Sequence, residues 1–137
     1  MVSKKKIYII SIGWSDRSSG AGIQADLKTV MSLGGYCTVS ITSITAQNKN
    51  KVSKIYNLNS DLVIDQIKSV MDDFDIKGIK IGLVNNKELS KKISNYLKKY
   101  NIPIVVDPVF VSSSGFEFIE KSNYKVSQVY LSNHAKL

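Results

Sequence analysis

Short runs of nearly continuous apolar residues alternate along this chain with segments whose apolar residues recur at helical spacing. Strands buried on both faces of a parallel sheet have such continuous runs, whereas half-exposed strands alternate between apolar and polar residues. The pattern therefore predicts strands covered by helices on both faces, which restricts the chain to the α/β class. The predicted strands are residues 7–12, 36–45, 79–83, 104–106 and 126–131, with residues 54–57 as a candidate for a short extra strand.

Three segments have the apolar spacing of helices that pack one face on a sheet. They cover residues 23–31, 63–74 and 89–100. Ser60 is the predicted N-cap of the second helix, and Asn85 begins a capping-box spacing at the start of the third. Strands and helices in this order predict βαβ units, with a mostly parallel central sheet flanked by helices.

The charge of the chain is strongly positive but consists almost entirely of lysine. Among 137 residues, 19 are basic and 11 acidic, which gives a formal net charge of +8, and Arg17 is the single arginine. Arginine provides the bidentate contacts that dominate specific nucleic-acid recognition. A solvated lysine surface therefore explains the charge better, and a lysine-rich nucleic-acid-binding module stays as an alternative.

The length predicts one domain with a single core.

Three features of the sequence bear on the compartment. Cys37 is the only cysteine, so it cannot form an internal disulfide, and it fits a reducing cytoplasm. Lysines at 4–6 and the apolar run after them imitate a secretory signal, but a Ser- and Gly-rich loop follows instead of a cleavage site. No run of about 18 apolar residues exists to span a membrane. We therefore expect a cytoplasmic protein without a targeting peptide or a membrane partner.

Polar and glycine-rich residues follow the predicted strands. The segments are residues 13–22, 45–48, 82–84 and 107–109. Ligands of parallel α/β sheets bind beyond the carboxyl ends of the strands, so these segments predict a small-molecule site. His134 is the only histidine, and with one cysteine the chain cannot form a zinc site of His/Cys type, so we expect no bound metal.

The first of these loops also matches a loose dinucleotide-binding fingerprint. Gly20, Gly22 and Ala25 have the G-x-G-x-x-A spacing. The loop before Gly20 is too long for the tight turn of that motif, and no acidic residue follows the second strand to bind a ribose. Glycines that only turn the chain are the simpler interpretation of this loop taken alone.

Five blocks of residues in and around these loops occur together in the order known from one enzyme family. They are Ser15-Asp16, residues 20–29 with Gly-Ile-Gln-Ala-Asp within them, and residues 44–48, 80–83 and 107–109. Through these blocks the chain resembles the hydroxymethylpyrimidine and phosphomethylpyrimidine kinases of thiamine biosynthesis, members of the ribokinase-like superfamily. The resemblance extends to Asn133. It implies a partial ribokinase-like fold of three α/β/α layers, in which residues 1–137 are the N-terminal half of a kinase domain.

The resemblance implies a pyrimidine pocket at the strand ends. The implied substrate-binding residues are Gly22, Asp26, Thr45, Gln47, Leu83 and Val109. Among them, Asp26 and Gln47 would orient the aminopyrimidine, and Thr45 would contribute backbone groups. Leu83 and Val109 would form apolar walls. A carboxylate and a carboxamide at strand ends suit a ligand with both donors and acceptors.

The implied reaction transfers the γ-phosphoryl group of ATP, with Mg²⁺, to hydroxymethylpyrimidine or to its monophosphate. Asp107 and Asn133 are the residues expected on the cofactor side. The glycine-rich anion hole and the catalytic residue belong to the C-terminal half of such a kinase, so we expect no catalytic residue in residues 1–137. The isolated chain should then be weakly active or inactive and should bind ATP and Mg²⁺ poorly.

Two positions depart from the family pattern and leave alternatives open. Trp14 stands where the family usually has glycine, which would strain or block the pocket if the position needs a positive φ or a close ligand. Lys136 stands where a glutamate that helps to organise Mg²⁺ is usual. The chain could therefore be an inactive truncated remnant, or a module that binds a pyrimidine or pyridoxal. An open sheet edge would favour a second copy or a chain with the missing half as partner.

Overall fold

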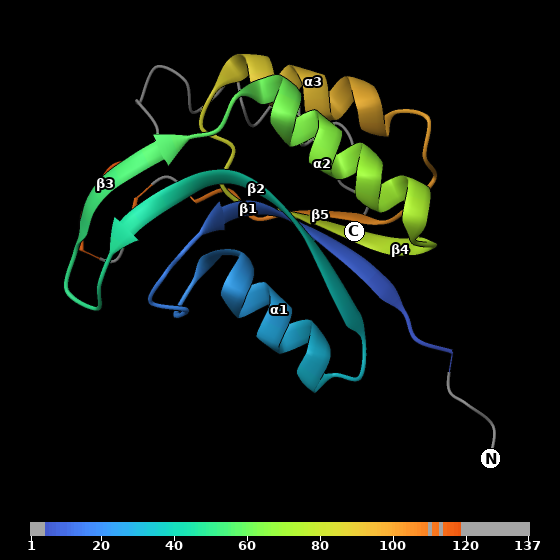
Figure 1. Ribbon diagram of the computed structural model, residues 1–137, viewed down its shortest axis with the longest axis horizontal. Coiled ribbons are helices and arrows are strands. Elements are labelled where there is room, and N and C mark those ends of the chain that lie inside the picture. Colours follow the sequence, from blue (N-terminus) through green and yellow to red (C-terminus); the bar gives the residue numbers. More distant parts are fainter. Residues whose placement is uncertain (1–4, 110, 113, 119–137) are drawn as a thin grey trace.

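The computed structural model describes residues 5–109, 111–112 and 114–118. The predicted strand at 126–131 and the residues Asn133, His134 and Lys136 lie outside these described residues. The elements are, in chain order, β1 (Tyr8–Ser15), α1 (Gly22–Ser32), β2 (Tyr36–Gln47), β3 (Val52–Asn57), α2 (Ser60–Asp73), β4 (Ile76–Ile81), α3 (Lys87–Leu97) and β5 (Ile104–Val106) (Figure 1).

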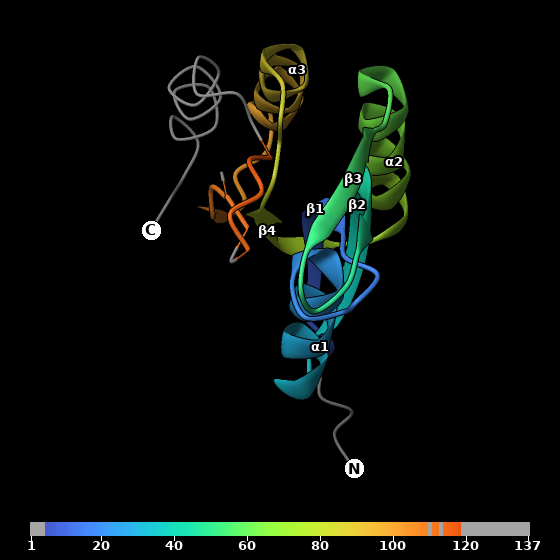
Figure 2. The same cartoon turned by 90° about the vertical axis from the view of Figure 1, so that its left-hand side faces the viewer.

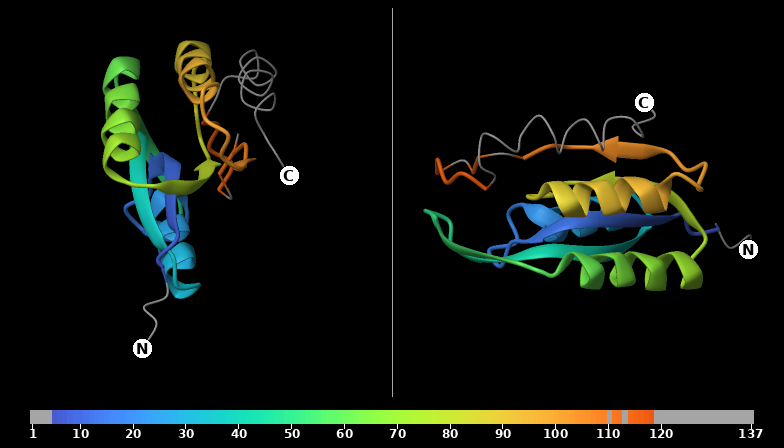
Figure 3. Two further views of the ribbon diagram at one scale, coloured as in Figure 1. Left: turned by 90° about the vertical axis from the view of Figure 1, so that its right-hand side faces the viewer. Right: turned by 90° about the horizontal axis from the view of Figure 1, so that it is seen from above.

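The described strands form one sheet in the order β3-β2-β1-β4-β5. β1 pairs in parallel with β2 and β4, β4 pairs in parallel with β5, and β3 runs antiparallel to β2. α1 covers one face of the sheet, and α2 and α3 lie on the other (Figures 1 and 2). The view from above in Figure 3 shows these two helices running along the strands. The prediction of a mostly parallel sheet between two helical layers is confirmed.

The larger apolar core lies between the sheet and the layer of α2 and α3. Ile10 and Ile12 of β1 have no exposed surface and belong to this core. Consecutive residues of a strand point to opposite faces. Ser11, between these isoleucines, therefore faces α1, where its hydroxyl donates a hydrogen bond to Asp26. The face of β1 toward α1 is thus less apolar than the continuous run predicts.

The N-caps of α2 and α3 each lie one residue away from the predicted position. The side chain of Asn59, not that of Ser60, accepts hydrogen bonds from the backbone N–H groups of Asp61 and Leu62. Similarly, Asn86, which follows Asn85, accepts from the N–H of Leu89. Both helices therefore begin as capped helices, with the first free N–H groups paired by an asparagine carbonyl.

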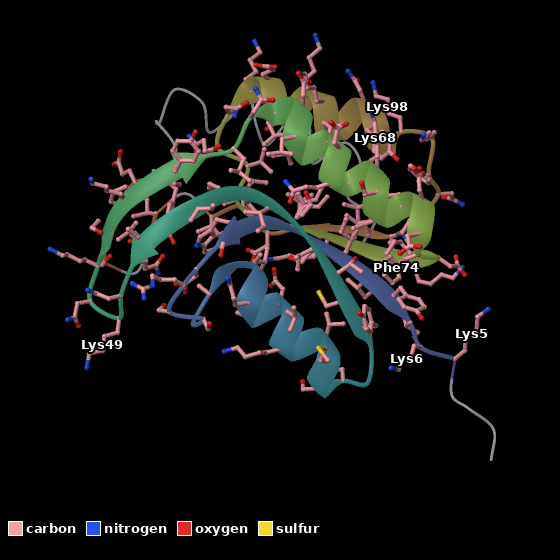
Figure 4. The ribbon with its side chains drawn as sticks, in the orientation of Figure 1. Lys5, Lys6, Lys49, Lys68, Phe74 and Lys98 are labelled. Carbon is pink, nitrogen blue, oxygen red and sulfur yellow. The ribbon has the colours of Figure 1, made fainter. Side chains whose placement is uncertain are left out.

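The lysines labelled in Figure 4 lie in separate regions of the molecule. Lys49 lies at the hairpin between β2 and β3, Lys5 and Lys6 precede β1, and Lys68 and Lys98 lie on the side of α2 and α3 (Figure 4).

The longest described helix, α2, has 14 residues. Within the described ranges, no helix has the length and apolar character needed to cross a bilayer.

Candidate functional site

A pocket of about 350 Å³ opens at the carboxyl ends of the strands, beside the N-terminus of α1. Its volume is in the range of small-molecule sites. It lies where a parallel α/β sheet places its ligands, as predicted. The described residues that line it are Trp14, Ala21, Gly22, Ala25, Asp26, Gln47, Lys80, Asp107, Val109, Val111, Ser112 and Phe118.

Five of the predicted site residues meet in this pocket. They are Gly22, Asp26, Gln47, Asp107 and Val109, which come from α1, the end of β2 and the segment after β5. Their roles toward a ligand stay predictions. Asn133, predicted on the cofactor side, lies outside the described residues.

Thr45 and Leu83, the other two predicted site residues, do not line the pocket. The hydroxyl of Thr45 is buried, 2.8 Å from the carbonyl oxygen of Ser15 and 3.2 Å from Oε1 of Gln47. Leu83 has no exposed surface and packs with Trp14 and other residues of a small apolar cluster. Within the described residues, Thr45 therefore supports β1 and Gln47, and Leu83 supports the apolar side of the site.

Lys80 adds a cation that the motif-based prediction of the site did not include. Its Nζ lies 2.9 Å from Oδ2 of Asp26 and 3.6 Å from Oδ2 of Asp107. Ser11 donates to the same Oδ2 of Asp26 at 2.6 Å. Lys80 and Asp26 are each 22% exposed, so this ion pair is partly shielded from water. A charged residue inside the apolar run of β4 was the sequence signal for it.

The loop after β1 is built around the carboxylate of Asp16, which is 1% exposed. One oxygen accepts from the N–H and the hydroxyl of Ser18, and the other accepts from the N–H groups of Gly20 and Ala21. Burial raises the pKa of Asp16, but the hydrogen bonds from Ser18, Ala21 and Gly20 outweigh it and leave the pKa below its ordinary value. Asp16 does not line this pocket itself. It accepts a hydrogen bond from the N–H of Ala21, which does line the pocket, and so fixes the position of that residue.

We expect the stabilising contribution of Asp16 to be complete at neutral pH and to be lost in acid. Its pKa in the folded chain is lowered. A lowered pKa gives stability that is present above the unfolded value of about 4 and disappears as the pH falls through the folded pKa. The measurement is the free energy of unfolding in urea, for the natural chain and for Asp16→Asn, between about pH 6 and about pH 2.

The difference between these two proteins should shrink as the pH falls below about 4. Asp61 and Asp75 also have lowered pKa values, because Lys92 and Lys77 hydrogen-bond to them. Both residues are present in both proteins, so their contributions cancel in the difference. A difference that stays constant over the acidic range would contradict the assignment of this carboxylate.

Trp14 lies at the apolar side of the pocket and is 5% exposed. Its ring centroid is 5.6 Å from that of Phe118. Among the described residues, Ser19 is the only non-glycine residue with a positive φ, so Trp14 does not have the backbone strain that a positive φ would cause. The indole lines the pocket and leaves space beside it.

The two carboxylates at the pocket are both paired with a cation of the protein. Within the described residues, no group of three or more His, Cys, Asp or Glu side chains could hold a metal ion. Asp26 and Asp107, the two carboxylates at the pocket, both lie against the ammonium group of Lys80. A divalent cation there would meet a cation of the protein at short range.

Comparisons with known proteins agree with the fold and with the motifs at the pocket. The family model described as phosphomethylpyrimidine kinase matches residues 16–137. The hydroxymethylpyrimidine/phosphomethylpyrimidine kinase of Rhizobium meliloti is 43% identical over 106 residues, which cover 77% of this chain and 40% of the relative. The enzyme of the same name from Escherichia coli is 37% identical over 119 residues, 86% of this chain and 45% of the relative.

Solved structures show the same similarity in three dimensions. The phosphomethylpyrimidine kinase of Clostridium difficile has a TM-score of 0.81 and 41% identity, over 90% of this chain and 54% of that structure. The pyridoxal kinase of Staphylococcus aureus in complex with pyridoxal has a TM-score of 0.83 and 28% identity, over 96% of this chain and 48% of that structure. The chain thus spans about half the length of these proteins.

Proposed function

The chain belongs to the phosphomethylpyrimidine kinase family, and from this premise we propose that its pocket binds the pyrimidine substrate of a kinase of thiamine biosynthesis. The observation that carries the proposal is the lining of one cavity at the strand ends. Asp26 and Gln47 contribute hydrogen-bonding groups to it, and Trp14 contributes an aromatic surface. Pockets for small molecules combine apolar walls with a few placed polar groups in this way.

The polar groups of the pocket complement an aminopyrimidine. The carboxylate of Asp26 is an acceptor for an exocyclic amino group. Oε1 of Gln47 lies near the hydroxyl of Thr45, which leaves the Nε2 of Gln47 to donate to a ring nitrogen. The flat ring would lie against Val109 and the aromatic side chains.

The proposed reaction moves the γ-phosphoryl group of ATP to the hydroxymethyl group of the pyrimidine or to its monophosphate. Kinases of this family use ATP. We propose that residues 1–137 supply the pyrimidine half of the kinase domain. The donors that stabilise the transferring phosphoryl group would come from a part of the domain that the longer relatives have. The single cysteine, Cys37, which is buried and free, supports a reducing compartment such as the cytoplasm.

Replacing Asp26 by asparagine is expected to weaken binding of hydroxymethylpyrimidine about tenfold, because the change replaces a charge-assisted hydrogen bond worth about 1.5–3 kcal/mol by a weaker neutral one. Titration calorimetry on the full chain measures it. Asp65→Asn is the matched control, since Asp65 is an exposed carboxylate paired with Lys68 on α2. Equal binding by Asp26→Asn and the natural chain would remove the assigned pocket.

The same purified chain is tested for catalysis with Mg-ATP and hydroxymethylpyrimidine, and ADP and phosphorylated product are measured. Product above a no-enzyme control would show that the chain acts alone. Binding without product would favour a binding module or a half that needs a second part. Binding of neither ATP nor pyrimidine would favour an inactive remnant.

Pyridoxal is the second candidate ligand. It is favoured by the likeness of this fold to the pyridoxal kinase of Staphylococcus aureus, at a TM-score of 0.83 and 28% identity. Pyridoxal has no exocyclic amino group to donate to Asp26, so it would rely on other groups of the pocket. Competition between pyridoxal and hydroxymethylpyrimidine in the calorimeter ranks the two ligands on the same protein.

A further inference from the structure

Lys80 is the only cationic side chain among the described residues that line the pocket. We propose that Lys80 is a positioning residue for substrate recognition. Together with Ser11 it binds one oxygen of Asp26, and it thereby directs the other oxygen of Asp26 toward the amino group of the ligand. This inference rests on the proposed function, because it names the group that prepares the same pocket for a heteroaromatic amine.

The hydrogen bonds to Asp26 are one-sided. Ser11 Oγ donates at 2.6 Å and Lys80 Nζ at 2.9 Å, and both reach Oδ2. Within the described part of the chain, no hydrogen bond to Oδ1 accompanies them. Rotation of the carboxylate would break both bonds at once, so its orientation is fixed while Oδ1 keeps its capacity to accept.

The residue that follows β4 leaves room for the side chain of Lys80. This residue, Gly82, lies two residues after Lys80 on the same face of the chain, and a Cβ there would be 3.2 Å from Lys80 Nζ. A larger residue at that position would press on the ammonium group. The long side chain can therefore extend from β4 over the face of the sheet that α1 covers, and reach Asp26.

The charges of this cluster also define the ligand that it accepts. Lys80 lies between Asp26 and Asp107, at 2.9 and 3.6 Å, so two carboxylates share one cation. The residual charge is negative, which disfavours a phosphate at this end. The ligand class is a neutral or protonated heteroaromatic amine, with any phosphate directed away from Asp26.

The test compares two ligands on the natural chain and three variants by titration calorimetry. The ligands are hydroxymethylpyrimidine and its analogue with hydrogen in place of the amino group. Lys80→Met should weaken binding of hydroxymethylpyrimidine about tenfold or more, because Asp26 would no longer be oriented for its charge-assisted hydrogen bond with the amino group. It should leave binding of the analogue nearly unchanged, because the analogue has no amino group for Asp26. Lys80→Arg keeps the positive charge, so its affinity for hydroxymethylpyrimidine should be close to that of the natural chain.

Lys92→Met is the matched control. Lys92 also bridges two carboxylates, Asp61 at 2.7 Å and Glu88 at 2.8 Å, but none of these residues lines the pocket. This variant should bind both ligands like the natural chain. If Lys80→Met is unfolded at the temperature of the titration, Ser11→Ala takes its place. This variant removes the other donor to Oδ2 of Asp26, and its affinities for the same two ligands are compared.

The outcomes separate this inference from the proposed function. Binding of neither ligand by the natural chain overturns both. If the natural chain binds hydroxymethylpyrimidine and Lys80→Met binds it equally well, the inference alone is overturned. An equal loss for both ligands also overturns it, because a purely structural role would act on both. A loss confined to the amino-bearing ligand, rescued by Lys80→Arg, supports it.

Discussion

Replacing Asp16 by alanine is expected to lower the free energy of unfolding by about 2–4 kcal/mol, because hydrogen bonds to a charged acceptor contribute about 1.5–3 kcal/mol each and several are lost together. The carboxylate is 1% exposed and accepts four hydrogen bonds, three from backbone N–H groups and one from the Ser18 hydroxyl. Alanine would leave these donors without the charged acceptor that fixes the path of the loop.

The loss should extend to ligand binding, because the same loop leads into α1. Gly20 and Ala21 donate to Asp16, and Ala21 lines the pocket together with Gly22, the first residue of α1. The N-terminus of α1 has no side-chain cap from Ala21, the residue at its N-cap position. Asp16 is thus the acceptor that organises this helix start from outside the helix.

Urea denaturation of the natural chain and of Asp16→Ala measures the difference. Asp75→Ala is the matched control, since Asp75 is an exposed carboxylate that pairs with the exposed Lys77. That variant should leave the free energy of unfolding nearly unchanged. Equal stability of the two alanine variants would show that the Asp16 hydrogen bonds contribute little.

The layers of this fold could be predicted because the sequence pattern follows from burial. β1 is covered by helices on both faces, and a strand buried in this way has a continuous apolar run. The run around Ile10 and Ile12 therefore predicts a strand independently of the loops. The positions of the N-caps could not be predicted to the residue. Asn59 and Ser60 are both good N-cap residues, and only the path of the chain decides which one begins the helix.

The pocket could be predicted in part for a similar reason. Asp26 and Gln47 lie near strand ends, and parallel strands bring such ends together, so both meet in one cavity. Leu83 follows β4 and Thr45 lies within β2 near its end, but both side chains point into packed regions, and this depends on side-chain direction. Lys80 escaped the prediction of the site because its partner, Asp26, is 54 residues away in sequence.

Gly22→Ala is the second change with a large expected effect, a loss of about 2–4 kcal/mol in the free energy of unfolding. Gly22 has a φ of 60°, where alanine costs about 1 kcal/mol. A Cβ there would also lie 2.5 Å from the carbonyl oxygen of Trp14 and 3.2 Å from its indole. Backbone cannot withdraw as a flexible side chain can, so this contact should add about 1–3 kcal/mol.

Gly34→Ala separates these two contributions. Gly34 has a φ of 84°, and a Cβ there would meet nothing within 4 Å, so this variant should lose only the backbone part, about 1 kcal/mol. Trp14 is the only tryptophan of the chain, and its fluorescence should change in Gly22→Ala and stay constant in Gly34→Ala. Equal melting temperatures and equal spectra for the two variants would mean that Gly22 is needed for its φ alone. A lower melting temperature with a shifted spectrum in Gly22→Ala would show that the fold also depends on the close approach of α1 to Trp14.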